Sequence, residues 1–265
     1  MRILFIGDIV GRPGRECAAA LVPVLREELG LDFVVANAEN AAGGFGVTGE
    51  IAQALFESGV DALTTGDHIW SGKNAESLLA QERRVLRPAN YPDNTPGSGD
   101  GVFAAADGTH VGVINLLGVT FMPPMDSPFE VAERCVNRLR EQARVIVVDM
   151  HAEATAEKKA LACYLDGQVS AVVGTHTHVQ TADEKILPGG TAFLTDLGMT
   201  GPEDSVLGMK VEVALRRYLT RRPARYAVAE GPSLLCGAVI EVDNKTGRAQ
   251  TITRIQRRSD PSVFQ

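Results

Sequence analysis

Two histidines lie two positions apart in the segment "THTHV", residues 175–179, directly after the apolar run "VSAVVG". Side chains at positions i and i+2 of a strand point to the same face, so a strand that continues through this segment would direct His176 and His178 toward one point. The chain has only five histidines, and two neutral imidazoles that converge can bind a metal ion. An isolated pair can equally be two ordinary polar loop residues, so the rest of the chain has to decide.

Residues that can bind metals also follow four other apolar runs. The carboxyl ends of parallel strands share one edge of an α/β sheet, and ligand sites form there. Each residue alone has an ordinary interpretation, such as a helix cap or a turn, but their joint placement favours one common site. The residues are Asp8 after "ILFIG", Glu39 and Asn40 after "FVVANA", Asp67 and His68 after "ALTTG", and His151 after "VIVVDM".

This mixture of carboxylates and imidazoles indicates which metals the site would take. It suits manganese, iron or zinc, whereas calcium or magnesium would favour a shell made entirely of oxygen atoms. A single ion uses about four to six ligands, and the set is larger than that. Because Glu39 has two oxygens that can bridge, we predict two metal ions.

The elements that would position these residues alternate along the chain. Short β-rich apolar runs with helical segments between them predict parallel strands joined by helical crossovers, which is an α/β fold. Two segments, "GVFAAADGTHVGVINLLG" and "GAVIEVDNKTGRAQTITRIQ", predict antiparallel hairpins. Gly30 is expected to end one helix, and Thr48 to cap the start of the next. We see no linker or repeat, and we expect one domain over residues 1–265.

The composition excludes several classes of protein. The chain of 265 residues is 45% hydrophobic and 22% charged, as expected for a soluble globular protein. Its net charge of −7 argues against binding to long nucleic acids but leaves a small phosphorylated ligand open. Four cysteines without a CxxC spacing favour buried, reduced thiols and a cytoplasmic location. We expect neither a signal peptide nor a membrane partner, because no apolar run approaches about 18 residues.

Seven segments, in order, resemble the motifs of the YmdB-type branch of the calcineurin-like metallophosphoesterases. The resemblance runs through nearly the whole chain and implies an αββα two-sheet sandwich. It also implies a dinuclear metal phosphodiesterase active on 2′,3′-cyclic nucleotides, with iron as the expected metal and manganese or zinc as alternatives. Whether the protein forms a homo-oligomer is left open. The segments are "FIGDIVGRPG", "NAENAAGGFG", "TTGDHIW", "RPANYP", "MHAEATAEK", "GTHTHVQTAD" and "TDLGMTGP".

The resemblance also implies a role for each candidate residue. Glu39 is expected to bridge the two metals, and His68 to be the general acid that protonates the departing oxygen. A metal-activated hydroxide would be the nucleophile. One metal would be held by Asp8, Glu39, Asn40 and His178, and the other by Glu39, Asp67, His151 and His176.

One position departs from the family pattern. The family has Gly-Asn-His where this chain has Gly66-Asp67-His68. A carboxylate at Asp67 adds a negative charge, which should bind a metal more firmly but make it a weaker Lewis acid and repel an anionic substrate. We therefore keep a catalytically weak nucleotide-binding regulator as an alternative. A metal-dependent phosphomonoesterase, which would share the site, is a second one.

Overall fold

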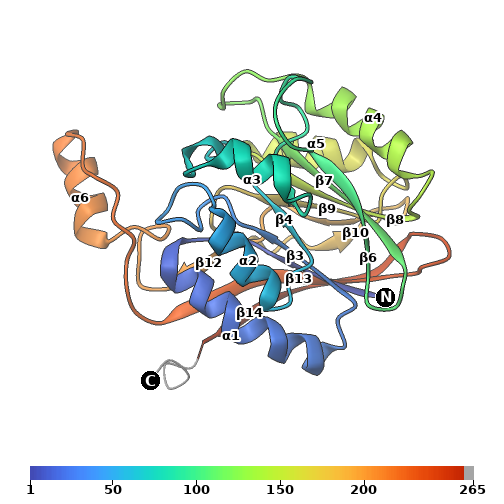
Figure 1. Cartoon of the computed structure of the whole chain (residues 1–265), viewed down its shortest axis with the longest axis horizontal. Helices are drawn as coiled ribbons and strands as arrows, with labels where there is room; N and C mark the ends of the chain where they lie inside the picture. Colours follow the sequence, from blue (N-terminus) through green and yellow to red (C-terminus); the bar gives the residue numbers. More distant parts are fainter. Residues whose placement is uncertain (260–265) are drawn as a thin grey trace.

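Two β-sheets lie face to face in the computed structural model of the protein, which describes residues 1–259 (Figure 1). The last six positions of the predicted domain, 260–265, lie outside the described residues. The first sheet has the order β2-β12-β13-β1-β3-β4-β5, with β14 beside β13. Its strands are β1 (Arg2–Ile6), β2 (Asp8–Ile9), β3 (Phe33–Asn37), β4 (Ala62–Thr64), β5 (Val85–Leu86), β12 (Met199–Pro202), β13 (Ser233–Val242) and β14 (Ala249–Arg258).

The second sheet has the order β10-β11-β9-β8-β7-β6. Its centre is parallel, since β7, β8, β9 and β11 pair in that orientation. The two predicted hairpins are confirmed, because β6 pairs antiparallel with β7, and β13 with β14. The strands are β6 (Asp100–Ala104), β7 (His110–Leu117), β8 (Val145–His151), β9 (Ala171–Thr175), β10 (Lys185–Ile186) and β11 (Ala192–Leu194).

Three hydrophobic clusters separate the layers. Strand β1 is buried on both faces: Ile3 and Phe5 belong to the cluster between the two sheets, while Leu4 and Ile6 face the helices of the first sheet. The second sheet packs on its own helices through a third cluster. This confirms the predicted αββα two-sheet sandwich. The first sheet is covered by α1 (Gly11–Leu29), α2 (Gly49–Glu57) and α3 (Ala75–Gln81), and the second by α4 (Pro128–Leu139) and α5 (Thr155–Tyr164).

The helix boundaries that the sequence predicts are confirmed. Helix α1 runs through Pro23 and ends at Gly30, whose φ of 59° lies in the left-handed region that glycine adopts readily. Helix α2 begins after Thr48, whose side chain accepts a hydrogen bond from the backbone N–H of Ile51. These two ends fix where the chain enters and leaves β3, the strand that leads into Glu39 and Asn40.

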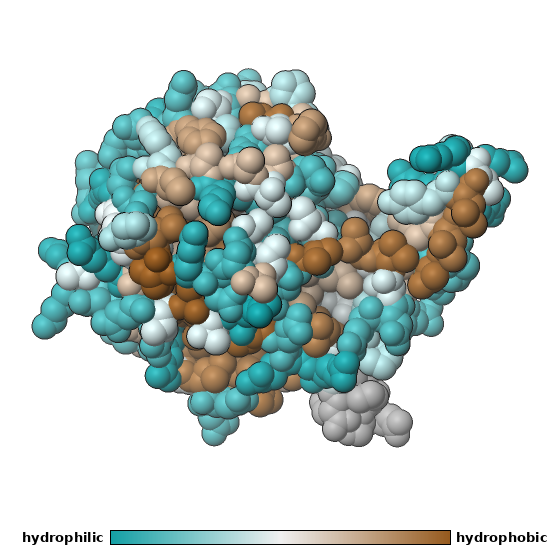
Figure 2. Space-filling model, turned by 180° about the vertical axis from the view of Figure 1, so that it is seen from behind, coloured by the Kyte–Doolittle hydropathy of each residue, from teal (hydrophilic) through white to brown (hydrophobic). Residues whose placement is uncertain are grey.

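Helix α6 (Val211–Thr220) projects from the rest of the molecule (Figure 1). Apolar side chains are gathered along this projection, as Figure 2 shows, and the exposed ones are Val211, Leu215, Tyr218 and Leu219. Within residues 1–259, every helix is too short or too polar to span a lipid bilayer.

The cysteines follow the sequence expectation with one exception. Cys17, Cys135 and Cys236 are buried, but Cys163 is exposed near the end of α5. The prediction was wrong there because α5 buries Leu161 and Ala162 against the sheet, which leaves its next residue on the outer side of the helix.

Candidate metal centre

The seven predicted metal ligands lie at the ends of strands from both sheets. Asp8 opens β2, Glu39 and Asn40 follow β3, and Asp67 follows β4, all in the first sheet. The second sheet supplies His151, the last residue of β8, and the two histidines that follow β9. The expectation of one shared sheet edge is therefore corrected. The residues meet because the two sheets pack face to face and bring these strand ends opposite one another.

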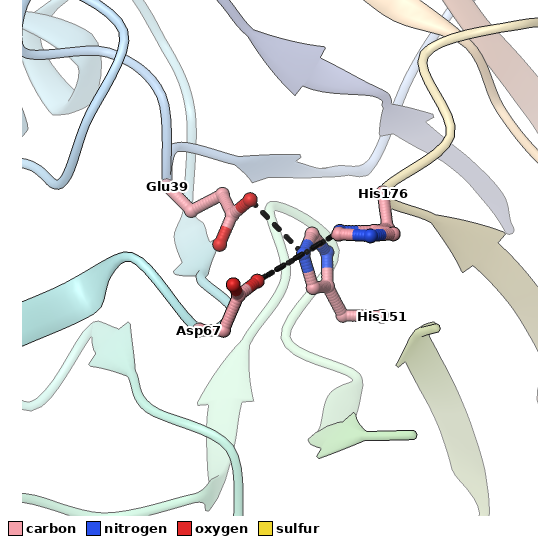
Figure 3. Close-up of side chains that lie close together, drawn as sticks. All are labelled: Glu39, Asp67, His151 and His176. Atoms are coloured by element: carbon pink, nitrogen blue, oxygen red, sulfur yellow. Dashed lines mark hydrogen bonds and ion pairs between the residues drawn. The ribbon is translucent and has the colours of Figure 1, made fainter. Parts of the chain in front are cut away.

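Four of these residues form a compact cluster. Metal-binding atoms of Glu39, Asp67, His151 and His176 all lie within 4.8 Å of one another, and the side chains point toward a common centre (Figure 3). His151 Nε2 lies 3.0 Å from Glu39 Oε1 and 3.5 Å from Asp67 Oδ1. His176 Nδ1 lies 3.1 Å from His151 Nε2 and 3.7 Å from Asp67 Oδ1. These are the same four residues that the resemblance assigns to one metal ion.

The three remaining predicted ligands lie beside this cluster. His178 Nε2 is 3.1 Å from Asn40 Oδ1. Asp8 is fully buried, accepts a hydrogen bond from the backbone N–H of His176, and has its Oδ1 3.7 Å from His151 Nδ1. Burial raises the pKa of Asp8 to about 6. Asp8 therefore touches the residues of the four-residue cluster, while Asn40 and His178 form a pair next to it.

The residues present fit metal ions. Among the described residues, Oδ1 of Asp8 and Oδ1 of Asp67 are buried without a hydrogen-bond partner. Burying a carboxylate oxygen without a partner is unfavourable, and a bound cation would satisfy it. Carboxylate oxygens together with imidazole nitrogens are a donor set that iron, manganese and zinc accept.

The three predicted histidine ligands are His151, His176 and His178. Each has a hydrogen-bond acceptor near the ring nitrogen that is not directed at the four-residue cluster or at Asn40. His151 Nδ1 lies 2.8 Å from Thr175 Oγ1, and His178 Nδ1 lies 3.1 Å from the carbonyl oxygen of Leu207. His176 Nε2 lies 3.3 Å from a carboxylate oxygen of Glu153. When an acceptor holds the proton on the outer nitrogen, the inner nitrogen presents its lone pair to a metal. The contacts thus favour metal-binding tautomers.

The contact to His151 continues into a buried polar network. Thr175 Oγ1 donates to Asp149 Oδ1 at 2.6 Å, so the same hydroxyl is left to accept the proton of His151 Nδ1. Asp149 Oδ2 accepts from Thr64 Oγ1 at 2.5 Å and from Asn37 Nδ2 at 3.0 Å. Every member of this network is fully buried. The ring of His151 is therefore fixed in orientation from behind.

The titration of His176 agrees with a metal-binding role. Burial lowers the pKa of His176 to about 4. The imidazole is therefore neutral at pH 7, and only the neutral form can bind a metal.

His68 lies at the edge of the cluster. Its backbone N–H donates to Glu39 Oε2 at 3.2 Å, and its Nδ1 lies 3.3 Å from Glu39 Oε1. The hydrogen bond to Glu39 raises the pKa of His68 and so favours the form that carries a proton to give away. The ring also makes an edge contact with Phe45, with ring centroids 5.0 Å apart, and Phe45 makes a similar contact with Tyr226.

The segment "THTHV" is not a continuation of the strand, which corrects a second expectation. Strand β9 ends at Thr175, and both His176 and His178 have positive φ angles, 94° and 65°. The turn consequently sends His176 to the four-residue cluster and His178 to Asn40, and the two side chains do not converge on one point. A positive φ costs a residue other than glycine roughly 1–3 kcal/mol, so other contacts must hold this turn.

Several residues of the site were not found from the sequence. Asp149 precedes His151 by two positions in β8 and so shares its face, which was a usable signal. Glu153 lies in the segment "MHAEATAEK", and no spacing rule separates it from an ordinary surface carboxylate. Thr175 looks like any strand residue until its contact with His151 is seen.

Gly66 tests the geometry of the cluster. A Cβ atom added there would overlap Glu39 Oε2 and the ring of His151, so we expect Gly66→Ala to displace both side chains and to abolish metal binding. The measurement is metal content by mass spectrometry after incubation with Mn²⁺.

Gly49→Ala in α2 is the matched control, because the nearest atom to its added Cβ is 4.0 Å away. It should keep the metal content of the unmodified protein. Normal metal content in the Gly66 variant would show that the cluster is not the binding site.

Comparisons with known proteins agree with this geometry. A profile of the YmdB-like protein family matches residues 4–255. A 2′,3′-cyclic-nucleotide 2′-phosphodiesterase of Bacillus subtilis (strain 168) is 48% identical over 265 residues, which cover all of both chains.

Two solved structures are also similar. The crystal structure of a hypothetical protein from Thermus thermophilus has a TM-score of 0.92 at 40% identity, covering 98% of this chain and 100% of that one. The structure of a phosphatase from Mycoplasma pneumoniae has a TM-score of 0.90 at 31% identity, covering 100% of this chain and 96% of that one. Since the sequence profile, the full-length relative and the fold agree, the chain belongs to the YmdB-like protein family.

Proposed function

We propose that the protein is a dinuclear metal-dependent phosphodiesterase that hydrolyses 2′,3′-cyclic nucleotides. The observation that carries the proposal is the compact cluster of Glu39, Asp67, His151 and His176 at the facing strand ends. The full-length relative with the name 2′,3′-cyclic-nucleotide 2′-phosphodiesterase supports the substrate class. A cytoplasmic location, expected from the cysteines, stays a prediction.

In this proposal the residues divide between two metal sites. Glu39 is assigned to both, because it lies in the four-residue cluster and a carboxylate has two oxygens that can bridge two ions. Asp8, Asn40 and His178 complete one site, while Asp67, His151 and His176 complete the other. When bound, the two ions would activate a water molecule and neutralise the charge of the phosphate, with iron as the predicted metal and manganese or zinc as alternatives.

His68 is the proposed general acid. Cleavage breaks the bond between phosphorus and one ribose oxygen, and that oxygen must take up a proton as it departs. The side chain of His68 is 32% exposed, whereas those of His151 and Glu39 are almost entirely buried, so His68 can meet a substrate that enters from solvent. Its hydrogen bond to Glu39 keeps the ring directed at the cluster and raises its pKa.

The substrate class is tested by turnover. We expect the purified protein, loaded with metal, to hydrolyse 2′,3′-cyclic AMP faster than p-nitrophenyl phosphate, and to lose this activity after treatment with a chelator. A preference for the phosphomonoester would favour the monoesterase alternative. Binding of the cyclic nucleotide without turnover would favour the regulator.

A further prediction concerns the number of metal ions bound per chain. We expect about two transition-metal ions per chain, because seven candidate ligands exceed what one ion can use. Metal analysis after dialysis in the presence of excess Mn²⁺ or Fe²⁺ measures this number. A value near zero would rule out the metalloenzyme, and a value near one would rule out the dinuclear centre.

Another prediction compares the effects of replacing Glu39 and His68 on metal content and turnover. Glu39→Gln should lower both metal content and turnover, because Glu39 is proposed to hold both ions. His68→Ala should keep the metals and reduce kcat by about 10² to 10⁴, the usual contribution of a general acid. Both variants are assayed for metal content and for kcat on 2′,3′-cyclic AMP.

His110→Ala is the matched control for the histidine change, since His110 is exposed at the start of β7 and lies outside the site. It should leave kcat unchanged. The bridging role of Glu39 is wrong if the Gln variant keeps both metals and normal activity.

The last prediction on the proposed function concerns the charge of Asp67. Restoring the family residue with Asp67→Asn removes one negative charge, so bound water should become more acidic and an anionic substrate should be repelled less. At saturating metal we expect a higher kcat, whereas at limiting metal the weaker amide ligand should reduce occupancy. The measurement is kcat on 2′,3′-cyclic AMP over a series of metal concentrations.

Glu141→Gln removes the same charge at an exposed position just before β8, at the end of that strand opposite His151, and should change neither quantity. An equal or lower kcat for the Asp67 variant at full occupancy would show that the carboxylate is tolerated or required. That result would remove the main reason for the regulator alternative.

A further inference from the structure

A buried lysine lies close to the site without belonging to it. Lys158 of α5 is fully buried, although lysine is among the residues least often found inside proteins. Its ammonium group donates to Asp196 Oδ2 and to the carbonyl oxygen of Thr175, at 2.7 Å in each case. The side chain of Asp196 is 1% exposed. Buried ion pairs are often replaceable by apolar residues without loss of stability, so this one calls for another explanation.

Asp196 binds the turn that carries His176 and His178, called here the histidine turn, at Thr177. Its Oδ2 accepts from the backbone N–H of Thr177 at 3.1 Å and from the Thr177 hydroxyl at 2.7 Å. Its Oδ1 accepts from the backbone N–H of Gly198 at 2.8 Å. The ion pair is thus hydrogen-bonded to Thr175 and to Thr177, the residues on either side of His176.

These hydrogen bonds are made where the backbone is strained, at residues 175–178. His176 and His178 are two of the six described residues other than glycine that have a positive φ, and Thr177 lies between them. The chain beyond the turn is held as well, since the backbone N–H of Met199 donates to the carbonyl oxygen of His178 at 3.2 Å. A conformation of this kind persists only where its surroundings determine it.

The space around the lysine is equally specific. A Cβ atom added at Gly174 would overlap the carbonyl oxygen of Thr195 and lie 2.7 Å from Cδ of Lys158. Glycine at this position of β9 lets the lysine stem pass between α5 and the strand to reach the turn. Lys158 ends the segment "MHAEATAEK", and Asp196 is the second residue of "TDLGMTGP", a segment that contains none of the predicted metal ligands.

We propose that Lys158 and Asp196 are positioning residues that hold the strained turn and thereby set His176 and His178 in their metal-binding geometry. Neither residue is a metal ligand in this assignment, and Asp196 acts through Thr177. The inference rests on the proposed function only in that the two histidines bind metal. It does not depend on which phosphate ester is hydrolysed.

Thr177 gives the sharpest test, because its hydroxyl can be removed without changing the ion pair or the size of the side chain. Thr177→Val loses the hydroxyl hydrogen bond to Asp196 but keeps the one from the backbone N–H, whereas Thr177→Ser keeps both. Metal affinity is measured by titrating the metal-free protein with Co²⁺ and following visible absorbance. Loss of a contact that orients a ligand usually weakens metal binding by about 10- to 100-fold, so we expect this loss for Val and near-normal affinity for Ser.

The ion pair itself is tested with the double variant Lys158→Met and Asp196→Asn, which leaves no unpaired charge inside the protein. Its metal affinity should fall at least as far as that of Thr177→Val. The midpoint of thermal unfolding of each metal-free variant is recorded in parallel, to separate a loosened turn from a loosened fold.

Ser170→Ala is the matched control. Ser170 is a fully buried residue before β9 and is hydrogen-bonded to the backbone of Ile146 and Gly247, away from the turn. Its replacement should lower the unfolding midpoint and leave Co²⁺ affinity unchanged.

Two results would overturn the proposal. One is wild-type affinity in Thr177→Val. The other is a fall in affinity for Ser170→Ala as large as that for Thr177→Val, because general destabilisation would then explain both. A wild-type protein that binds Co²⁺ but hydrolyses no cyclic nucleotide would refute the proposed function alone and leave this inference standing.

Discussion

The concentration of negative charge at the facing strand ends is the constraint on which the site depends. Asp8 and Glu39 are buried, and Asp67 lies beside Glu39 in the four-residue cluster. Carboxylates in a poorly solvated place repel one another strongly unless cations or protons lie between them. The protein surrounds these groups with imidazoles, and each of the three histidines predicted as metal ligands has an acceptor that fixes the orientation of its ring. A metal centre is the arrangement in which all these features have a use.

Two kinds of contact give the site its rigidity. The rings of His151, His176 and His178 are oriented by hydrogen bonds to their outer nitrogens. The backbone that carries the last two histidines is held by Lys158 and Asp196 through the neighbouring threonine and carbonyl groups. Orientation of the rings would be of little value on a mobile turn, because a metal site tolerates only small errors in ligand position. The buried ion pair and the outer acceptors therefore complement each other.

Much of the fold could be predicted from the sequence because its signals are local. The β-rich runs, the two hairpin segments, and the caps at Thr48 and Gly30 each depend on residues within a few positions. The set of candidate ligands was also accessible, since a polar residue directly after an apolar run marks a strand end. The pattern of apolar runs did not show which strands belong to which sheet, because strands that pair lie far apart in the chain.

The geometry of the histidine turn was inaccessible for a related reason. Residue type signals the positive φ at His176 and His178 only weakly, because histidine adopts it more often than most residues but still rarely. The conformation is maintained by Asp196, which lies 20 positions after His176. Extrapolating strand geometry through Thr175 predicted that both rings meet at one point, and this was wrong. A strand rule fails where tertiary contacts impose another backbone conformation, and functional sites are where such contacts concentrate.

Asp67 shows how one substitution can alter a site whose framework is intact. Burial opposes ionisation of this carboxyl, but the nearby His151 and His68 together lower the pKa of Asp67 below its ordinary value, so the side chain is charged at pH 7. The additional charge therefore acts on the site, because protonation does not cancel it. Its Oδ1 lies 3.5 Å from His151 Nε2 and 3.7 Å from His176 Nδ1, where the oxygen of an asparagine could also lie. The shape of the cluster is thus compatible with either residue, and the difference between them is electrostatic. In the proposed centre, the additional charge would favour metal occupancy and disfavour the approach of a phosphate, so this side chain would shift the balance between binding and turnover.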